Sequence, residues 1–212
     1  MCEIQWLFFD LGSTLIDESE CYRRRILHMI DGSAVSYEEF FSAMMDFYRQ
    51  GKKGDKLAAA RYGCRLPPWE SQYEVLYPDT KDCLERLRHT YRLGVIANQD
   101  FGTEKRMRAF GMDQYFDVVI ASAEEGIAKP DPKIFRLALS RAGCLPEQAV
   151  MIGDRLDNDI TPAKKLGFTT VRVMRGFGRF AVPVSEEETP DYTVDNLRQL
   201  IFRLKGFCQG EG

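Results

Sequence analysis

The sequence has 212 residues, of which 44% are hydrophobic and 29% are charged, and its formal net charge is −3. These values are typical of one large globular domain, or of one domain with an insertion. They argue against a nucleic-acid partner, which usually requires a basic stripe. They also argue against a membrane protein, because no apolar run approaches the roughly 20 residues of a membrane-spanning helix.

Cysteine usage and the N-terminus predict a cytoplasmic protein. The six cysteines are widely separated and no CxxC pair is present, so a zinc site is not expected. Glu3 and Gln5 precede only a short apolar run, which is unlike a secretory signal. We therefore expect reduced thiols.

Short apolar runs bounded by turn residues predict six β-strands. In chain order they span residues 4–9, 93–97, 117–121, 149–152, 169–173 and 192–194. Patterns with helical spacing lie between or after them, at residues 80–90, 103–110, 132–142, 159–166 and 195–204. This alternation predicts an α/β fold with a doubly wound, mostly parallel sheet.

Residues 16–78 do not follow this alternation. They contain three predicted helices, at 20–30, 37–49 and 56–62, and no predicted strand. The interval is far longer than the loop of about 2–6 residues that usually follows a strand in α/β proteins. We therefore predict a small α-helical domain at 16–78, inserted into a core domain formed by residues 1–15 and 79–212.

Polar residues follow several predicted strands at the point where each strand ends. They are Asp10, Asn98, Lys129, Asp154 and Asp159. In a parallel sheet these positions share the edge where ligands bind. Clustered carboxylates raise one another's pKa unless a cation joins them, and Mg²⁺ prefers carboxylate and phosphate oxygens. A carboxylate beside a bound phosphate can also attack it, so the pattern predicts metal-dependent phosphoryl transfer.

Taken one at a time, the same residues allow simpler interpretations. Asp10 also fits a turn, Asn98 a strand-end cap and Asp159 a helix N-cap. Lys129 on its own would be a solvated loop lysine. The prediction of a site therefore depends on the order of the motifs and not on any single residue.

Three segments resemble the motifs of the haloacid dehalogenase-like hydrolase superfamily. They are Asp-Leu-Gly-Ser-Thr-Leu at 10–15, Lys-Pro-Asp-Pro at 129–132 and Gly-Asp-Arg-Leu-Asp-Asn-Asp at 153–159. Their order and separations match the family, and they extend over almost the whole chain. The resemblance implies a Rossmann-like core, with the helical insertion as the family's cap domain.

The resemblance also implies a Mg²⁺ site. Asp10 would be both the nucleophile and a metal ligand, Gly12 would offer its backbone carbonyl, and Asp154 would be a further ligand. Asp159 would orient the water shell of the metal, or Lys129.

A phosphate-binding set is implied as well. Lys129 would hold the phosphate and compensate the charge of the nucleophile, so it counts as a catalytic residue beside Asp10. Thr14 would support the nucleophile loop. Asn98 is a candidate phosphate donor, because Ala97 stands where the family usually has a Ser or Thr hydroxyl.

One departure concerns proton transfer. Phosphatases of the family carry a second aspartate two residues after the nucleophile, as general acid and base, and this chain has Gly12 there. General acid–base assistance is worth about 10²–10⁴-fold in rate.

The sequence thus predicts a Mg²⁺-dependent phosphatase for a small phosphorylated metabolite, acting through an aspartyl-phosphate on Asp10. A first alternative is a non-catalytic module that binds phosphate, metal or a partner protein through the same residues. A second is a metal-independent dehalogenase or a related hydrolase. Neither the substrate nor the oligomeric state follows from the sequence.

Overall fold

The computed structural model describes residues 3–208, so residues 1–2 and 209–212 of the predicted core domain lie outside the described part. Six parallel strands form one sheet in the order β5-β4-β1-β6-β7-β8. In that order they are Val118–Ala121, Arg92–Ala97, Trp6–Phe9, Ala149–Gly153, Thr169–Val173 and Tyr192–Val194. Each contains most of one predicted strand, and the α/β fold with a parallel sheet is confirmed.

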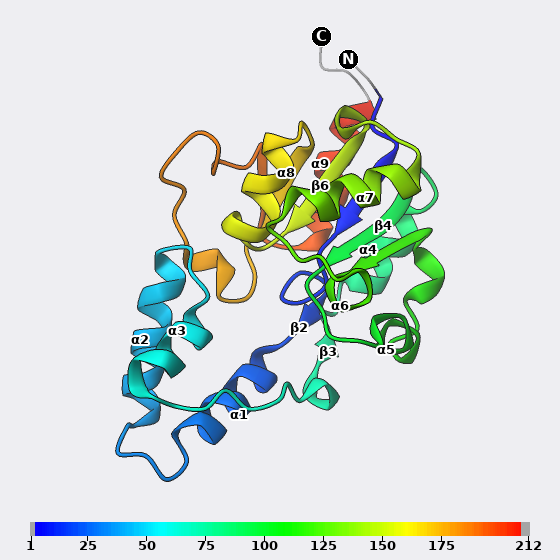
Figure 1. Cartoon of the computed structure of the whole chain (residues 1–212). Helices are drawn as coiled ribbons and strands as arrows, with labels where there is room; N and C mark the ends of the chain where they lie inside the picture. Colours follow the sequence, from blue (N-terminus) through cyan, green and yellow to red (C-terminus); the bar gives the residue numbers. More distant parts are fainter. Residues whose placement is uncertain (1–2, 209–212) are drawn as a thin grey trace.

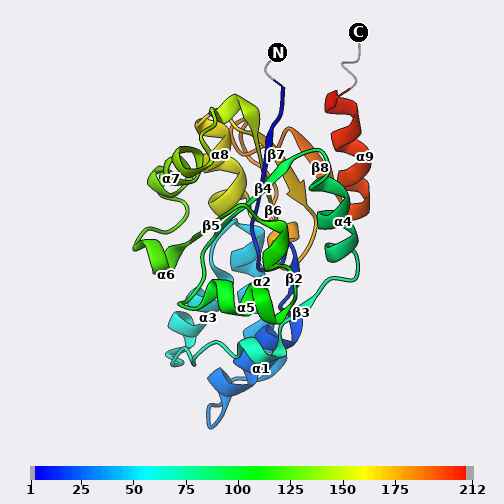
Figure 2. The ribbon, with the colours of Figure 1, turned by 90° about the vertical axis from the view of Figure 1, so that its right-hand side faces the viewer.

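Helices cover both faces of this sheet. Successive residues of a strand point to opposite faces, so Leu7 and Phe9 join one buried cluster while Trp6 and Phe8 join another. One face is covered by α4 (Thr80–Leu87) and α9 (Leu197–Cys208). The other face is covered by α7 (Pro132–Ala142) and α8 (Thr161–Lys165). Figure 2 shows the resulting three layers.

A separate group of helices lies beyond the carboxyl ends of the strands (Figure 1). It consists of α1 (Ser19–Ile30), α2 (Tyr37–Arg49) and α3 (Gly54–Tyr62), which are the three helices predicted between residues 16 and 78. They enclose a hydrophobic cluster of their own, in which Phe40 and Met44 are fully buried. Because this cluster is distinct from those beside the sheet, the helices are stabilised mainly by one another.

A short antiparallel pair of strands connects this helical group to the sheet. β2 (Ile16–Asp17) leads out of the core, β3 (Val75–Leu76) leads back, and Ile16 pairs with Leu76. No sequence pattern predicts this pair, because a two-residue strand is too short to show alternation. The pair brings the two ends of the inserted segment together beyond the carboxyl end of β1 (Figure 1).

The predicted helix at 159–166 differs from what is observed. The structure has a π-helix at Leu156–Ile160 followed by α8, and the amides of Asp159 and Ile160 both donate to the Arg155 carbonyl. Pro162, near the start of α8, has no N–H to continue the preceding turn. Two further short helices, α5 (Thr103–Ala109) and α6 (Ser122–Glu125), follow β4 and β5.

Within residues 3–208, none of the helices has the length and hydropathy needed to cross a membrane. Cys21, Cys64, Cys83 and Cys144 are free thiols. Cys2 and the side chain of Cys208 lie outside the described part.

Candidate active site

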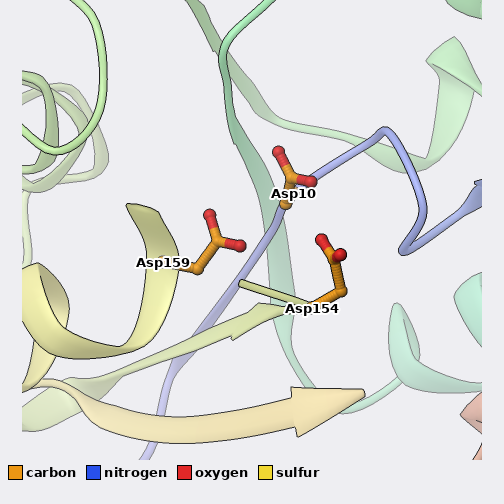
Figure 3. Close-up of side chains that lie close together, drawn as sticks. All are labelled: Asp10, Asp154 and Asp159. Atoms are coloured by element: carbon orange, nitrogen blue, oxygen red, sulfur yellow. The ribbon is translucent and has the colours of Figure 1, made fainter. Parts of the chain in front are cut away.

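Three carboxyl groups meet at the carboxyl edge of the sheet. Asp10 directly follows β1 and Asp154 directly follows β6, and these strands are parallel neighbours. Asp159 reaches the same place from the π-helix. Figure 3 shows the three side chains side by side, and one oxygen from each lies within 4.8 Å of the others. All three residues are buried, so water screens their mutual repulsion poorly.

Lys129 supplies a positive charge to this cluster. Its Nζ donates to Asp10 Oδ1 at 2.7 Å, to Asp159 Oδ1 at 2.5 Å and to the Ile96 carbonyl at 2.8 Å. Burial works against the charged form, but the carboxylates of Asp10 and Asp159 outweigh it and raise the pKa of Lys129. The side chain is therefore a fixed cation with all three N–H donors in use.

One lysine does not compensate three carboxylates. Burial raises the pKa of Asp154 well above its usual range, and the charges of Asp159 and Asp10 add to this effect. Burial also raises the pKa of Asp159 to about 6, although Lys129 opposes the rise. No described residue donates a hydrogen bond to the Asp154 carboxyl group. A buried acidic group without a donor, next to other carboxylate oxygens, fits a hard cation such as Mg²⁺.

The Asn98 side chain is bound to the backbone of Lys129. Asn98 Nδ2 donates to the Lys129 carbonyl at 2.9 Å, and the Lys129 amide donates to Asn98 Oδ1 at 2.7 Å. Both ends of the amide are thus occupied, although Asn98 also lines the pocket. These two hydrogen bonds fix the backbone of Lys129. A contact between Asn98 and phosphate stays a prediction.

The loop after Asp10 places Gly12 and Ser13 in the pocket wall but not Thr14. Ser13 has φ +59°, and this left-handed conformation turns the chain away from the sheet. Thr14 is fully buried and its hydroxyl has no hydrogen-bond partner. Its carbonyl accepts from Arg175 Nη1 at 2.9 Å. The Thr14 side chain is therefore buried away from the pocket, and both its support of the loop and its contact with phosphate stay predictions.

Glu18 is a pocket residue that the sequence analysis missed. It directly follows β2, and Ser13 Oγ donates to its Oε2 at 3.0 Å. Burial raises the pKa of Glu18 to about 8, and the charges of Asp10 and Glu74 contribute. No local signal singles it out, because its place beside Gly12 depends on the turn between the two residues.

The pocket has a volume of about 420 Å³ and lies between the sheet edge and the helical group. The sheet side contributes the acidic cluster and Lys129. The opposite wall contains Lys53, Lys56 and the ion pair of Arg25 with Asp55, whose Nη1 and Oδ2 atoms are 3.0 Å apart. Aromatic side chains complete the wall, namely Tyr22, Tyr48, Trp69 and Phe177. A small anionic molecule with a modest apolar part suits these surroundings.

Comparison with known proteins decides the family. The family model described as haloacid dehalogenase-like hydrolase matches residues 4–167. The chain belongs to the haloacid dehalogenase-like hydrolases. It is 37% identical to a glyceraldehyde 3-phosphate phosphatase of Methanopyrus kandleri over 93% of this chain and 96% of that protein. A second protein of that description, from Methanocaldococcus jannaschii, is 31% identical over 95% and 97% of the two chains.

Solved structures agree with this membership. The chain superposes on a phosphatase of the same superfamily from Thermococcus onnurineus with a TM-score of 0.68. The match covers 96% of this chain and 99% of the other, at 26% identity. In this haloacid dehalogenase-like hydrolase, the three sequence motifs come together at one site. Lys129 contacts Asp10, and one carboxylate oxygen of Asp154 lies within 4.8 Å of one of Asp10.

Proposed function

We propose that this hydrolase is a Mg²⁺-dependent phosphatase that cleaves monophosphate esters of small metabolites. The observation that carries the proposal is the contact of Lys129 Nζ with both Asp10 and Asp159, beside Asp154. This arrangement places an ammonium group against the Asp10 carboxyl group while leaving other acidic oxygens for a cation. The phosphatase relatives, which match over almost the whole chain, support the same activity.

Asp10 attacks the phosphorus atom in this reaction, and an aspartyl-phosphate forms. Lys129 holds Asp10 Oδ1 and attracts the phosphate oxygens. Asp10, Asp154 and the Gly12 carbonyl would hold Mg²⁺, with Asp159 orienting its water shell or Lys129. The bound cation would neutralise charge on the phosphate oxygens.

The helical group acts as a cap over this site. We assign it residues 16–78, and the core residues 1–15 and 79–212. The wall that carries Lys53 and Lys56, together with the Arg25–Asp55 ion pair, then faces the part of the substrate that is not transferred. Substrate selection belongs to this wall, since the sheet edge is occupied by the reacting groups.

Glyceraldehyde 3-phosphate is the first substrate to test, because it is named for relatives that match over most of their length. Its three carbons are compatible with a pocket of about 420 Å³. We place the reaction in the cytoplasm, where the free thiols of the described residues would stay reduced.

The test is hydrolysis of p-nitrophenyl phosphate with and without Mg²⁺. Asp10→Asn removes the nucleophile, and we expect kcat/KM to fall by at least ~10³-fold. Asp46→Asn makes the same change on the exposed surface of α2 and should leave the rate unaltered. Equal activity of wild type and Asp10→Asn would overturn the proposal.

A non-catalytic module remains the competing function, and Gly12 favours it because position 12 has no side chain to move a proton. Calorimetry with Mg²⁺ and beryllofluoride separates the two. Binding without turnover of any ester supports the module, and turnover that depends on Asp10 excludes it. Metal-independent release of halide from 2-haloacids would instead indicate the dehalogenase, a reaction for which Asp154 and Asp159 have no evident use.

A further inference from the structure

Cleavage of an alkyl phosphate needs a proton on the departing oxygen. This requirement follows from the proposed phosphatase function, on which the inference rests. Gly12 has no side chain, so the proton must come from another group in the pocket. The geometry beside Gly12 identifies one.

Residues 10–12 alternate between the pocket and the core. Asp10 and Gly12 line the pocket, whereas Leu11 is fully buried in the hydrophobic cluster. A side chain at position 12 would therefore project on the same side as Asp10. A Cβ placed on Gly12 would lie 2.5 Å from Glu18 Oε1 and 2.8 Å from Glu18 Oε2. The Glu18 carboxyl group thus fills the space of the missing side chain.

One side-chain contact and the surrounding backbone position the Glu18 carboxyl group there. Ser13 Oγ donates to Oε2 at 3.0 Å. The Glu18 backbone sits between β2, which is paired with β3, and the first turn of α1, where its carbonyl accepts from the Tyr22 amide at 3.0 Å. The group is consequently positioned by the junction between cap and core, and it opens onto the pocket that contains Asp10 and Lys129.

We propose that Glu18 is the general acid and base of this enzyme, a carboxyl group supplied from position 18 where position 12 has none. A larger residue at position 12 would displace it. Glycine at 12 and glutamate at 18 therefore form a matched pair.

Glu18 moves one proton in each of the two half-reactions. An Asp10 oxygen bonds to phosphorus, the ester P–O bond breaks, and the departing oxygen takes the proton of the Glu18 carboxyl group. Water then attacks phosphorus and gives a proton to the Glu18 carboxylate, while the P–O bond to Asp10 breaks. The net products are alcohol and phosphate, with Asp10 and Glu18 restored.

The first test compares Glu18→Gln with Glu20→Gln, a matched change two residues along, on a side chain exposed and paired with Arg23. With p-nitrophenyl phosphate the leaving group needs no proton, so we expect kcat/KM of Glu18→Gln to stay within about threefold of wild type. With glyceraldehyde 3-phosphate we expect kcat/KM to fall by about 10²–10⁴-fold.

The second half-reaction provides a separate signature. Without a base, the aspartyl-phosphate of Glu18→Gln should accumulate. Rapid mixing with p-nitrophenyl phosphate should then release about one nitrophenolate per active site in a burst, before slow turnover. If Glu18 had only a structural role, the substitution would lower kcat/KM for both esters alike, and no burst would be seen. Calorimetry with Mg²⁺ and beryllofluoride checks that the variant retains its folded site.

A third test moves the carboxyl group from position 18 to position 12, to ask whether the two positions serve the same place in the pocket. Gly12→Asp combined with Glu18→Ala should recover turnover of glyceraldehyde 3-phosphate by at least tenfold over Glu18→Ala alone. If the double variant turns over glyceraldehyde 3-phosphate no faster than Glu18→Ala does, the matched pair is overturned. This comparison does not use Glu18→Gln, so it stays informative even if that variant folds poorly.

The outcomes also separate this inference from the function beneath it. A wild-type protein that hydrolyses neither ester overturns the phosphatase proposal and Glu18 with it. Hydrolysis that depends on Asp10, with Glu18→Gln behaving like Glu20→Gln, overturns only the role of Glu18.

Discussion

The Lys129 ammonium group allows buried carboxylates to share one edge of the sheet. It contacts Asp10 and Asp159 directly, and the residue is 2% exposed. In surroundings of low dielectric constant, removing the cation would leave these acids facing each other without compensation. The stability of the fold is therefore tied to the same contact that positions the carboxyl group of Asp10, the proposed nucleophile.

Lys129→Met tests this link. Removing one partner of a buried ion pair usually costs about 3–5 kcal/mol, and we expect a loss of that size in the free energy of unfolding at neutral pH. Urea unfolding in Mg²⁺-free buffer is the measurement. Lys165→Met removes an exposed partner of Glu187 and should cost less than about 1 kcal/mol. Equal losses in the two variants would show that Lys129 contributes no more than a surface lysine.

Among the single residues, those in the three sequence motifs were predictable and Glu18 was not. Asp10, Lys129 and Asp154 belong to motifs whose spacing is visible in the sequence, and the structure brings them together. Glu18 comes close to Gly12 only because the left-handed Ser13 and the β2–β3 pair fold the chain back. Such a contact depends on turn geometry, which residue types specify weakly.

At the level of elements, the strength of the hydrophobic pattern decided what could be predicted. The strands beside β1 are long apolar runs, such as 149–153, and their position follows from burial on both faces. β2 and β3 have two residues each, so no period could reveal them. The π-helix depends on which carbonyl two amides share, and sequence periodicity does not resolve that difference.

A buried ion pair joins three elements beneath the site. Arg175 Nη2 contacts both Asp79 oxygens at 2.6 and 2.7 Å, and Asp79 Oδ2 accepts from the Leu197 amide at 3.0 Å. Arg175 also binds the Thr14 carbonyl. The loop that follows Asp10 is thereby connected to the start of α4 and of α9.

We expect Asp79→Ala to lower the free energy of unfolding by about 3–5 kcal/mol, because it leaves Arg175 buried without its partner. Chemical denaturation measures this loss. Asp82→Ala, in the first turn of the same helix, breaks an exposed pair with Arg86 and should cost no more than about 0.5 kcal/mol. A similarly small effect at Asp79 would mean that solvent already reaches Arg175.

On the scale of the whole molecule, the helical group that we propose as the cap meets the core over the pocket through aromatic contacts as well as through β2 and β3. Phe177 lies in the core loop after β7, and its ring centroid is 5.0 Å from that of Tyr22 and 5.2 Å from that of Tyr48. A third contact, to Phe41, has centroids 5.9 Å apart. Because these rings also line or adjoin the pocket, the contact that closes the cap is part of the wall that a substrate would touch.

Phe177→Ala should loosen the cap without unfolding the sheet. Each aromatic pair is worth about 0.5–1.5 kcal/mol beyond its buried area, and the substitution removes three pairs, so we expect the closed arrangement to lose about 1.5–4.5 kcal/mol. Hydrogen exchange should accelerate in α1, α2 and α3 while β1 and β6 keep their protection. The KM for glyceraldehyde 3-phosphate should rise as well. Phe180→Ala, in the same loop but exposed beside Arg179, is the control, and unchanged exchange in the cap of Phe177→Ala would show that β2 and β3 alone hold it closed.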